Sequence, residues 1–344
     1  MKNISFGNDL FLPPIFFGTS SLGNQYQELS YSSKLEMTKQ WVKESSETVV
    51  LDSAGKYGAG LSLEMIGKTL RDLNVSPDKV VISNKLGWKR VELKTEEPTF
   101  EPGGTWVGLE YDAIQDISYQ GILDCHAQGC ELLGDPYKPK LLSVHDPDEY
   151  LAKAKSAEER ASLFNDIKGA YKALEELKEK GEVKGIGVGS KDWRIIKEIS
   201  SEVDLDWVMF ACSLTPYTHD DELVEFIAEL HRKQVSMINS AVFNAGFLLG
   251  GEFFDYRIPD PIKDVELFSW REKFHSICKK YYESPSEVCI QFGMKFPGIV
   301  ATALNSSKPN RISGHVKAIE AQISNDLWKE LYDEKLIKVD VSQY

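Results

Sequence analysis

The segment VVLDSAGKYG at residues 49–58 places a charged residue, Asp52, directly after a run of apolar residues. A short, continuously apolar run predicts a strand that is buried on both faces. The segment SLEMIGKTLRDL at residues 62–73 follows, with apolar residues at helical spacing. Together these segments predict one β–α unit with Asp52 at the carboxyl end of its strand.

The same unit recurs along the chain. Eight apolar segments predict strands: IFFG (15–18), TVVLD (48–52), KVVISNK (79–85), KLLSVH (140–145), KGIGVG (184–189), DWVMFACS (206–213), VSMINSAVF (235–243) and GIVATAL (298–304). Eight parallel βα units close a barrel, so the sequence predicts an α/β fold, the (β/α)8 TIM barrel. An open doubly wound sheet is the alternative, but no GxGxxG motif follows the first strand.

Three further stretches complete the expected architecture. Residues 3–12 predict an N-terminal β-hairpin that turns at Gly7-Asn8. Long loops at residues 86–112 and 243–262 follow strands, which places them at the C-terminal rim, where barrel active sites lie. Their aromatic residues predict walls of a substrate cleft: Trp88, Trp106, Phe243, Phe253, Phe254 and Tyr256. No linker or longer repeat interrupts the chain, so we expect a single domain over residues 1–344.

Composition narrows the function classes. The chain has 344 residues and a formal net charge of -13, and an acidic surface repels nucleic acid and anionic lipid. No apolar run is long enough to suggest a membrane span or a signal peptide. The five cysteines are scattered and form no CxxC pair, which is typical of reduced thiols. We therefore expect a cytoplasmic protein with no nucleic-acid or membrane partner.

A metal site is not indicated. Cys125, His126 and Cys130 lie close together in the sequence, but no second pair of ligands follows them. Packing on one helix explains these three residues better.

Four polar residues stand where packing does not require them. Asp52, Lys85 and His145 end three consecutive barrel strands, and Tyr57 follows Asp52 by five residues. Charged groups at the ends of buried strands are costly unless they are paired, and in a barrel these strand ends share one space. Together the four residues predict an active site.

The surrounding motifs give the chain its resemblance to a known family. They are DSAxxYGxGxSLExxG (52–67), SNKLG (83–87), HDPD (145–148), ALEELKEKGEVKGIGVG (173–189) and FNAGFL (243–248). With them the chain resembles the aldo-keto reductases from about residue 15 to about residue 320. The resemblance implies an NAD(P)-dependent oxidoreductase that moves hydride between a nicotinamide and a sugar or aldehyde carbon.

The resemblance also implies a role for each of the four residues. Tyr57 is the general acid/base, Lys85 and Asp52 tune it, and His145 orients the substrate. A phenol of pKa about 10 is poorly poised for proton transfer, and a neighbouring ammonium favours its ionised form. We therefore expect Lys85 to lower the pKa of Tyr57, with Asp52 offsetting the lysine charge. Trp88 and Trp106 are expected to contact the substrate together with His145.

The family's cofactor-binding residues are only partly matched in this chain. The matching residues are Gly18, Thr19, Ser20, Asp52, Ser190, Phe243, Asn244, Gly246, Ser306 and Arg311. The chain departs from the family at Asn305, where a lysine is common, at His315, where an asparagine is common, and at Ser240, where many reductases stack a tyrosine on the nicotinamide. Arg311 is suited to pair with a 2′-phosphate or to stack on adenine. We expect NADP or NAD, with a lean toward NADP.

The HDPD motif and the long segment between Lys85 and His145 resemble the sugar-dehydrogenase branch of the family. That branch oxidises L-fucose and related D-threo-aldoses at the anomeric carbon to lactones, and a pyridoxal-oxidising relative belongs to it. Three alternatives stay open: a general aldehyde or ketone reductase, a non-enzymatic nicotinamide-binding sensor or scaffold, and a metal-dependent barrel lyase or isomerase. The lyase is disfavoured because no clustered carboxylates end the strands. The sequence leaves the oligomeric state open.

Overall fold

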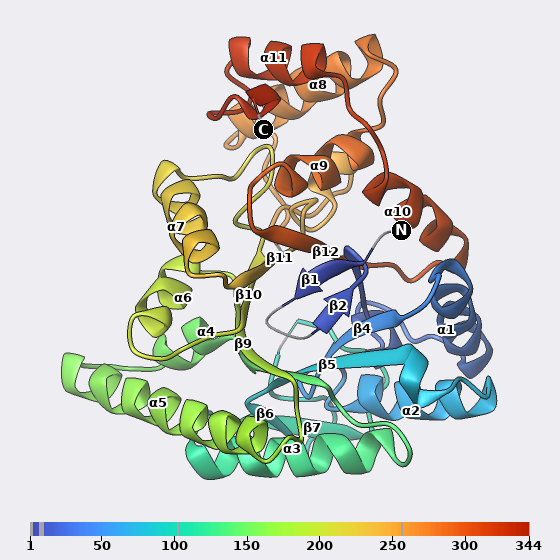
Figure 1. Ribbon diagram of the computed structural model, residues 1–344, viewed down its shortest axis with the longest axis vertical. Coiled ribbons are helices and arrows are strands. Elements are labelled where there is room, and N and C mark those ends of the chain that lie inside the picture. The colour runs from blue at the N-terminus through green and yellow to red at the C-terminus, as the bar shows by residue number, and fades with distance from the viewer. Residues whose placement is uncertain (1–2, 7–9, 102, 256, 344) are drawn as a thin grey trace.

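Eight parallel strands form a closed barrel in the computed structural model, which describes residues 3–6, 10–101, 103–255 and 257–343 (Figure 1). The strands follow one another in chain order: β3 (Ile15–Gly18), β4 (Val49–Ala54), β5 (Val80–Leu86), β8 (Leu141–His145), β9 (Gly185–Ser190), β10 (Trp207–Ala211), β11 (Ser236–Ser240) and β12 (Ile299–Asn305). Pairing of β12 with β3 closes the ring. Each of the eight strands overlaps its predicted segment, and β4, β5, β9 and β12 extend beyond it by one or two residues, so the (β/α)8 barrel is confirmed.

Helices surround the barrel (Figure 1). They are α1 (Tyr31–Glu44), α2 (Leu61–Asp72), α3 (Tyr119–Leu133), α4 (Pro147–Leu151), α5 (Ala157–Glu179), α6 (Trp193–Ser200), α7 (Asp221–Arg232), α8 (Val265–Lys280), α9 (Pro285–Met294), α10 (Ile312–Ile319) and α11 (Asn325–Asp333). Local signals set several boundaries. Ser284 begins α9 with a capping box to Glu287, and Gly181 follows α5 with a φ of 73°, a conformation that glycine adopts without strain.

An N-terminal hairpin closes the amino end of the barrel. β1 (Ile4–Phe6) pairs antiparallel with β2 (Leu10–Leu12), as predicted, while the predicted turn at Gly7-Asn8 lies outside the described residues. The ring of Phe6 lies 5.6 Å from Phe16 and 6.3 Å from Trp207, measured between ring centroids. These contacts fill the barrel interior from below and leave the opposite, carboxyl end for the site.

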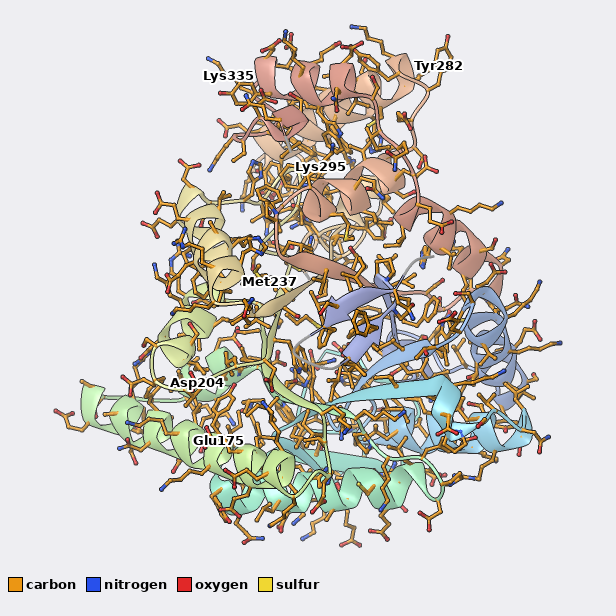
Figure 2. All side chains as sticks on the ribbon, viewed as in Figure 1. Glu175, Asp204, Met237, Tyr282, Lys295 and Lys335 are labelled. Atoms are coloured by element: carbon orange, nitrogen blue, oxygen red, sulfur yellow. The ribbon has the colours of Figure 1, made fainter. Side chains whose placement is uncertain are left out.

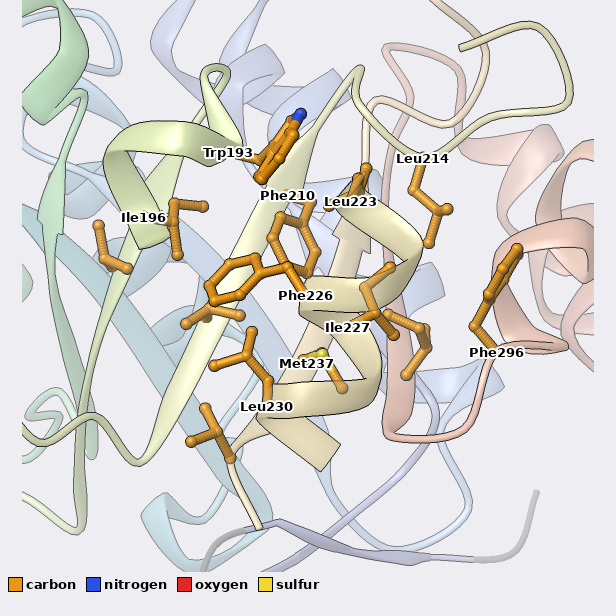
Figure 3. Packing of buried hydrophobic residues seen from close by; sticks show 14 of the residues in the cluster. Trp193, Ile196, Phe210, Leu214, Leu223, Phe226, Ile227, Leu230, Met237 and Phe296 are labelled. Atoms are coloured by element: carbon orange, nitrogen blue, oxygen red, sulfur yellow. The ribbon is translucent and has the colours of Figure 1, made fainter. Parts of the chain in front are cut away.

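Between the barrel and its helices the packing is apolar. Phe226 of α7 lies 6.3 Å from Phe210 of β10 and 6.0 Å from Trp193 of α6 (Figure 3). Burying one such side chain contributes roughly 1.5–3 kcal/mol. The outer faces are polar, as at Glu175 of α5, although Tyr282 is exposed beyond α8 (Figure 2). No helix in the described part of the chain has the length and apolarity to cross a bilayer.

The expected loop at residues 86–112 contains strands. β6 (Trp88–Glu92) pairs antiparallel with β7 (Tyr111–Gln115), so only the tip of this segment is irregular. Its two strands extend over the carboxyl rim before α3 begins. The Pro- and Gly-rich tip, with Gly103 and Gly104 between the strands, obscured the pairing in the sequence.

His219 ties the C-terminal segment to the body of the protein. Its Nδ1 lies 2.9 Å from the carbonyl oxygen of Thr215, and its Nε2 accepts a hydrogen bond of 2.8 Å from the backbone N–H of Lys338. Both bonds require the neutral imidazole with its proton on Nδ1. Burial lowers the pKa of His219 to about 4.

Acid is therefore expected to destabilise the fold through His219. The unfolded chain binds a proton below its pKa of about 6.5, whereas the folded chain binds it only near 4, so stability falls as pH falls through this window. We expect the loss from this residue to be about 2 kcal/mol between pH 7.5 and 5. The measurement is urea unfolding at both pH values. His219→Gln keeps an acceptor without titrating, and an equally steep pH dependence in this variant would contradict the account.

Candidate active site

Three strand ends bring charged and polar groups together at the carboxyl mouth of the barrel. Asp52 lies on β4, Lys85 on β5 and His145 at the end of β8, and all three are buried. The loop after β4 carries Tyr57 into the same space. The four residues that the sequence singled out are thus neighbours.

Asp52 and Lys85 form a buried ion pair. Lys85 Nζ donates to Asp52 Oδ2 at 2.6 Å, and the two side chains are only 3% and 4% exposed. An isolated buried ammonium is costly, so the carboxylate stabilises the charged lysine in this position. Asp52 Oδ1 is also buried and has no hydrogen-bond partner among the described residues.

Tyr57 lies against both Lys85 and His145. Lys85 Nζ is 4.8 Å from the centroid of the Tyr57 ring, and the His145 ring meets Tyr57 edge-on at 5.8 Å. Burial, followed by the carboxylates of Asp52 and Asp146, raises the pKa of Tyr57 well above its usual range.

That direction corrects the expectation that Lys85 lowers the pKa of Tyr57. The Asp52 carboxylate, 2.6 Å from Lys85 Nζ, raises the pKa of Tyr57, so the lysine does not act on the phenol as an isolated cation. The ammonium that does lower the pKa of Tyr57 belongs to Lys56, and burial outweighs it. In this state of the protein the phenol holds its proton.

His145 is held neutral. Burial, together with the nearby ammonium groups of Lys85 and Lys56, lowers the pKa of its imidazole well below the usual 6.5. Its Nδ1 is buried without a hydrogen-bond partner in the described structure. A neutral imidazole at the mouth of the barrel is suited to bind the oxygen of an incoming molecule without adding charge.

Close backbone packing fixes the loop that carries Tyr57. A Cβ at Gly55 would lie 2.2 Å from the carbonyl oxygen of Trp88, so only glycine fits between β4 and β6. Gly58 has a φ of 63°, and a Cβ there would lie 2.3 Å from the carbonyl oxygen of Gly23. The two glycines hold Tyr57 between them.

Aromatic side chains form one wall beside Tyr57. Trp106 lies 5.9 Å from the Tyr57 ring, Phe100 stacks on Trp106 at 6.3 Å, and Trp88 lies 5.9 Å from Phe100. Of the two predicted tryptophans, Trp106 is therefore the one in contact with Tyr57. Trp88 contacts Phe100 and lies under the ammonium of Lys56.

The aromatics of residues 243–262 do not form a second wall together. Phe254 packs edge-on against Tyr217 and Phe247 at 5.4 and 5.6 Å, within the apolar core beneath the loop. Phe253 is partly exposed and stacks on Tyr26 at 6.2 Å. Tyr256 lies outside the described residues. The cleft prediction is thus corrected for Phe254, because its ring fills the core.

A charged cluster beside the four residues was missed in the sequence. Lys56 Nζ lies 2.9 Å from Asp146, 2.8 Å from Glu149 and 3.8 Å from Glu101, and Lys191 also pairs with Glu149. The available signals were the position of Lys56 directly before Tyr57 and the acidic run after His145. Neither shows that Glu101, from a distant segment, completes the cluster.

The side chains of the residues after β3 form hydrogen bonds within the protein. Thr19 Oγ1 donates to the backbone oxygen of Asp52 at 2.9 Å and accepts from Ser62 at 2.8 Å. Ser20 Oγ donates to Gln25 at 2.6 Å and accepts from Asn305 at 2.9 Å. Asn305 stands where the family commonly has a lysine, and its hydrogen bond to Ser20 connects the end of β12 to the residues after β3.

Other predicted cofactor contacts lie around the same rim. Ser190 Oγ donates to the backbone oxygen of Asp192, and the buried Asn244 amide donates to Thr218 and Asp255. Gly246 faces open space, since no described atom lies within 4 Å of where its Cβ would sit. Phe243 packs against the apolar core.

After β12 the chain presents cations. Ser306 Oγ bonds with the backbone of Lys308 in a tight turn, and Arg311 is exposed at the start of α10. The chain as a whole has a net charge of -13, so an anionic dinucleotide needs local positive charge. The exposed cations after β12 supply it. Burial, followed by Arg311, lowers the pKa of His315 to about 4.

Among the described residues, no group of three or more His, Cys, Asp or Glu side chains is placed to hold a metal ion. His126 and Cys130 lie 3.9 Å apart on α3.

Comparison with known proteins defines the class of this chain. A model of the Aldo/keto reductase family matches residues 14–335. A pyridoxal 4-dehydrogenase from Microbacterium luteolum is 28% identical over 342 residues, covering 93% of each chain. A D-threo-aldose 1-dehydrogenase from a Pseudomonas species is 25% identical over 341 residues, covering 95% of each. The chain is therefore an NAD(P)-dependent oxidoreductase.

The chain belongs to the aldo/keto reductase family, and the curated D-threo-aldose 1-dehydrogenase confirms its resemblance to the aldose dehydrogenase branch. Solved structures agree on the fold. A glycerol dehydrogenase from Gluconobacter oxydans has a TM-score of 0.72 at 15% identity, covering 96% of this chain and 94% of that chain. An aldo-keto reductase from Bacillus halodurans has a TM-score of 0.70 at 18% identity, covering 98% and 96%.

Proposed function

We propose that this protein oxidises an aldose resembling L-fucose at the anomeric carbon, giving a lactone and a reduced nicotinamide. One observation carries the proposal: Tyr57 lies at the barrel mouth between the buried Asp52–Lys85 pair and the neutral His145. The curated relative that acts on D-threo-aldoses supports this substrate class. The test is a panel of aldoses and small aldehydes, assayed with both NAD and NADP.

Each residue has a proposed task. During oxidation Tyr57 first releases its own proton to solvent, and the phenolate then accepts the hydroxyl proton of the sugar; in the reverse reaction the phenol donates that proton. The Asp52–Lys85 pair holds a fixed dipole beside the phenol. His145, kept neutral, donates to or accepts from the reacting oxygen and orients it. Trp106 supplies an apolar face for the sugar, and Trp88 supports that face from behind through Phe100.

A nicotinamide cofactor supplies or takes up the hydride when it is bound. We propose that the backbone of Gly18, Thr19 and Ser20 and the side chain of Ser190 border its ribose and carboxamide, with Asp52 behind them. The loop of Phe243, Asn244 and Gly246 covers its pyrophosphate. Ser306 and Arg311 hold the adenosine end, and we favour NADP over NAD because Arg311 is an exposed fork for a 2′-phosphate.

Arg311→Ala is expected to weaken NADP binding by about 1.5–3 kcal/mol and to leave NAD nearly unchanged, since a 2′-phosphate loses a charge-assisted hydrogen bond. The two dissociation constants are measured by quenching of protein fluorescence in wild type and variant. Lys308→Ala is the matched control for general loss of positive charge at this rim. Equal weakening of both cofactors would assign Arg311 to adenine stacking, and tighter binding of NAD in the wild type would refute the preference for NADP.

A second candidate substrate class is an aromatic aldehyde of the pyridoxal type. The relative at 28% identity bears that activity in its name, and the aromatic wall of Phe100 and Trp106 suits a flat ring. Pyridoxal in the same substrate panel decides between the two classes by kcat/KM. A general reductase would favour simple aldehydes over both, and a non-enzymatic sensor would turn over none.

We further propose that the chain works as a single domain in the cytoplasm. None of the five cysteines forms a disulfide in the described structure, which suits a reducing compartment.

A further inference from the structure

Lys56 joins three segments that are distant in the sequence. It lies in the loop after β4, and its ammonium contacts Asp146 and Glu149 at the start of α4 and Glu101 from the tip of the β6–β7 hairpin. The Lys56 side chain is 7% exposed, whereas that of Glu101 is 32% exposed. The tip of the hairpin is thus attached to the catalytic rim through one buried cation.

The attraction is strong enough to keep Lys56 charged. Burial disfavours the ammonium, but Asp146, Glu101 and Glu149 outweigh it and raise the pKa of Lys56 above its usual value. Asp146 and Glu149 occupy two of its donor directions at 2.9 and 2.8 Å. Lys191 shares the charge of Glu149 at 2.9 Å, which leaves Lys56 with attraction for a further carboxylate.

Glu101, which is held by Lys56, also binds the side chain of Trp106. Its Oε2 accepts a hydrogen bond of 2.8 Å from the indole Nε1 of Trp106, whose ring lies 5.9 Å from Tyr57 at an angle of 32°. A tryptophan ring on an irregular segment has several rotamers, and a fixed acceptor for its N–H selects one of them. Glu101 therefore lies between the Lys56 ammonium and the ring beside Tyr57.

The backbone near Trp106 is held by other contacts. The N–H of Tyr26 donates to Thr105 at 2.7 Å, the N–H of Val107 donates to Asn24 at 3.2 Å, and the Asn24 side chain donates to Val107 at 3.1 Å. Removal of the Glu101 carboxylate should leave the path of the chain intact. What it releases is the orientation of the indole ring.

We propose that Lys56 and Glu101 are positioning residues, which fix the Trp106 ring against Tyr57 and so make the wall that selects a cyclic sugar. A cyclic aldose presents a C–H face that packs on a fixed indole, while its hydroxyls remain free for the polar groups around Lys56. A small acyclic aldehyde gains little from this wall. This inference rests on the proposed role of Tyr57 and adds the residues that determine its specificity.

The opposite charges of Lys56 and Glu101 make it possible to distinguish their positioning of Trp106 from a direct effect on the pKa of Tyr57. Lys56 lowers the pKa of Tyr57 whereas Glu101 raises it. Lys56→Met should therefore move the pH profile of oxidation upward, and Glu101→Ala should move it downward. If the two residues position Trp106, both variants should nevertheless raise KM for the aldose. A shared rise in KM with opposite pH shifts is not expected from charge effects alone or from partial unfolding.

A double-mutant cycle between Glu101 and Trp106 tests the proposal. Glu101→Ala should raise KM for the aldose about tenfold, the scale of one hydrogen bond to a charged acceptor, with little change in kcat. In the Trp106→Phe background, which has no indole N–H, the same substitution should change KM less than twofold. Glu101→Gln keeps an acceptor and should restore most of the wild-type KM. Equal effects of Glu101→Ala in both backgrounds would overturn the proposal.

One control variant and one measurement without turnover keep the outcome interpretable. Lys178→Met removes an ion pair of 2.6 Å with Asp206, at the opposite end of the barrel, and should change neither KM nor the pH profile. Because Glu101 is partly exposed, its variants stay informative even if Lys56→Met fails to fold. The indole N–H resonance of Trp106, among the seven tryptophans in a labelled protein, should shift and broaden in Glu101→Ala. That readout needs no turnover, so an unchanged resonance refutes the positioning role even if the proposed aldose reaction is wrong.

Discussion

Tyr57→Phe is expected to lower kcat by about 10²–10⁴-fold, the contribution typical of a positioned general acid/base. The phenol acts in proton transfer rather than in binding, so the dissociation constants of NAD and NADP should barely change. The substitution removes a single oxygen and leaves the ring contacts with Trp106 and His145 in place. Steady-state kinetics and fluorescence titration of the cofactor measure the two quantities.

The control for this experiment is Tyr26→Phe, which removes a phenol that stacks on Phe253 near the same rim. We expect this variant to keep most of the wild-type kcat. Retention of more than a tenth of the activity by Tyr57→Phe would remove Tyr57 from the proton-transfer role.

Asp52→Asn is expected to cost about 3–5 kcal/mol in the free energy of unfolding, because it leaves the buried Lys85 ammonium without its carboxylate. The alternative for the protein is to release the proton of Lys85, which also alters the surroundings of Tyr57. Either outcome should lower kcat by at least a hundredfold, roughly 2.7 kcal/mol of transition-state stabilisation. Urea unfolding and steady-state kinetics measure the two effects.

The double variant Asp52→Asn, Lys85→Met separates stability from activity. It removes both charges together, so most of the lost stability should return while the activity stays low. If the single Asp52→Asn variant unfolds at the same urea concentration as wild type, the buried Lys85 ammonium does not depend on the Asp52 carboxylate, and the account of this ion pair is wrong.

The barrel was predictable because its strands are buried on both faces and therefore leave continuous apolar runs. β8 and β10, with their residues buried almost throughout, illustrate this pattern. The β6–β7 hairpin was missed because its strands, WKRVE and YDAIQ, contain no continuous apolar run and flank a tip rich in Pro and Gly. Phe254 was assigned to a cleft wall because a sequence pattern does not distinguish an aromatic in a loop from one that fills the core beneath it.

The active site also contains residues that the sequence could predict and residues that it could not. Asp52, Lys85 and His145 could be predicted, because each interrupts an apolar strand at its end. Lys56 and Glu101 could not, because a charged residue in a loop is ordinarily solvated and only the fold brings these two within 3.8 Å. The direction of the Tyr57 pKa also depends on burial and on the nearby carboxylates of Asp52 and Asp146, which no spacing in the sequence reveals.

The most direct test follows the absorbance of the reduced nicotinamide after an L-fucose-like aldose is added to the protein with NADP or NAD. The account predicts that the reduced nicotinamide accumulates with wild type, that a lactone forms in equal amount, and that both signals are nearly abolished in Tyr57→Phe. Absence of the signal across the whole panel of aldoses and aldehydes, with a protein that binds the cofactor, would contradict it.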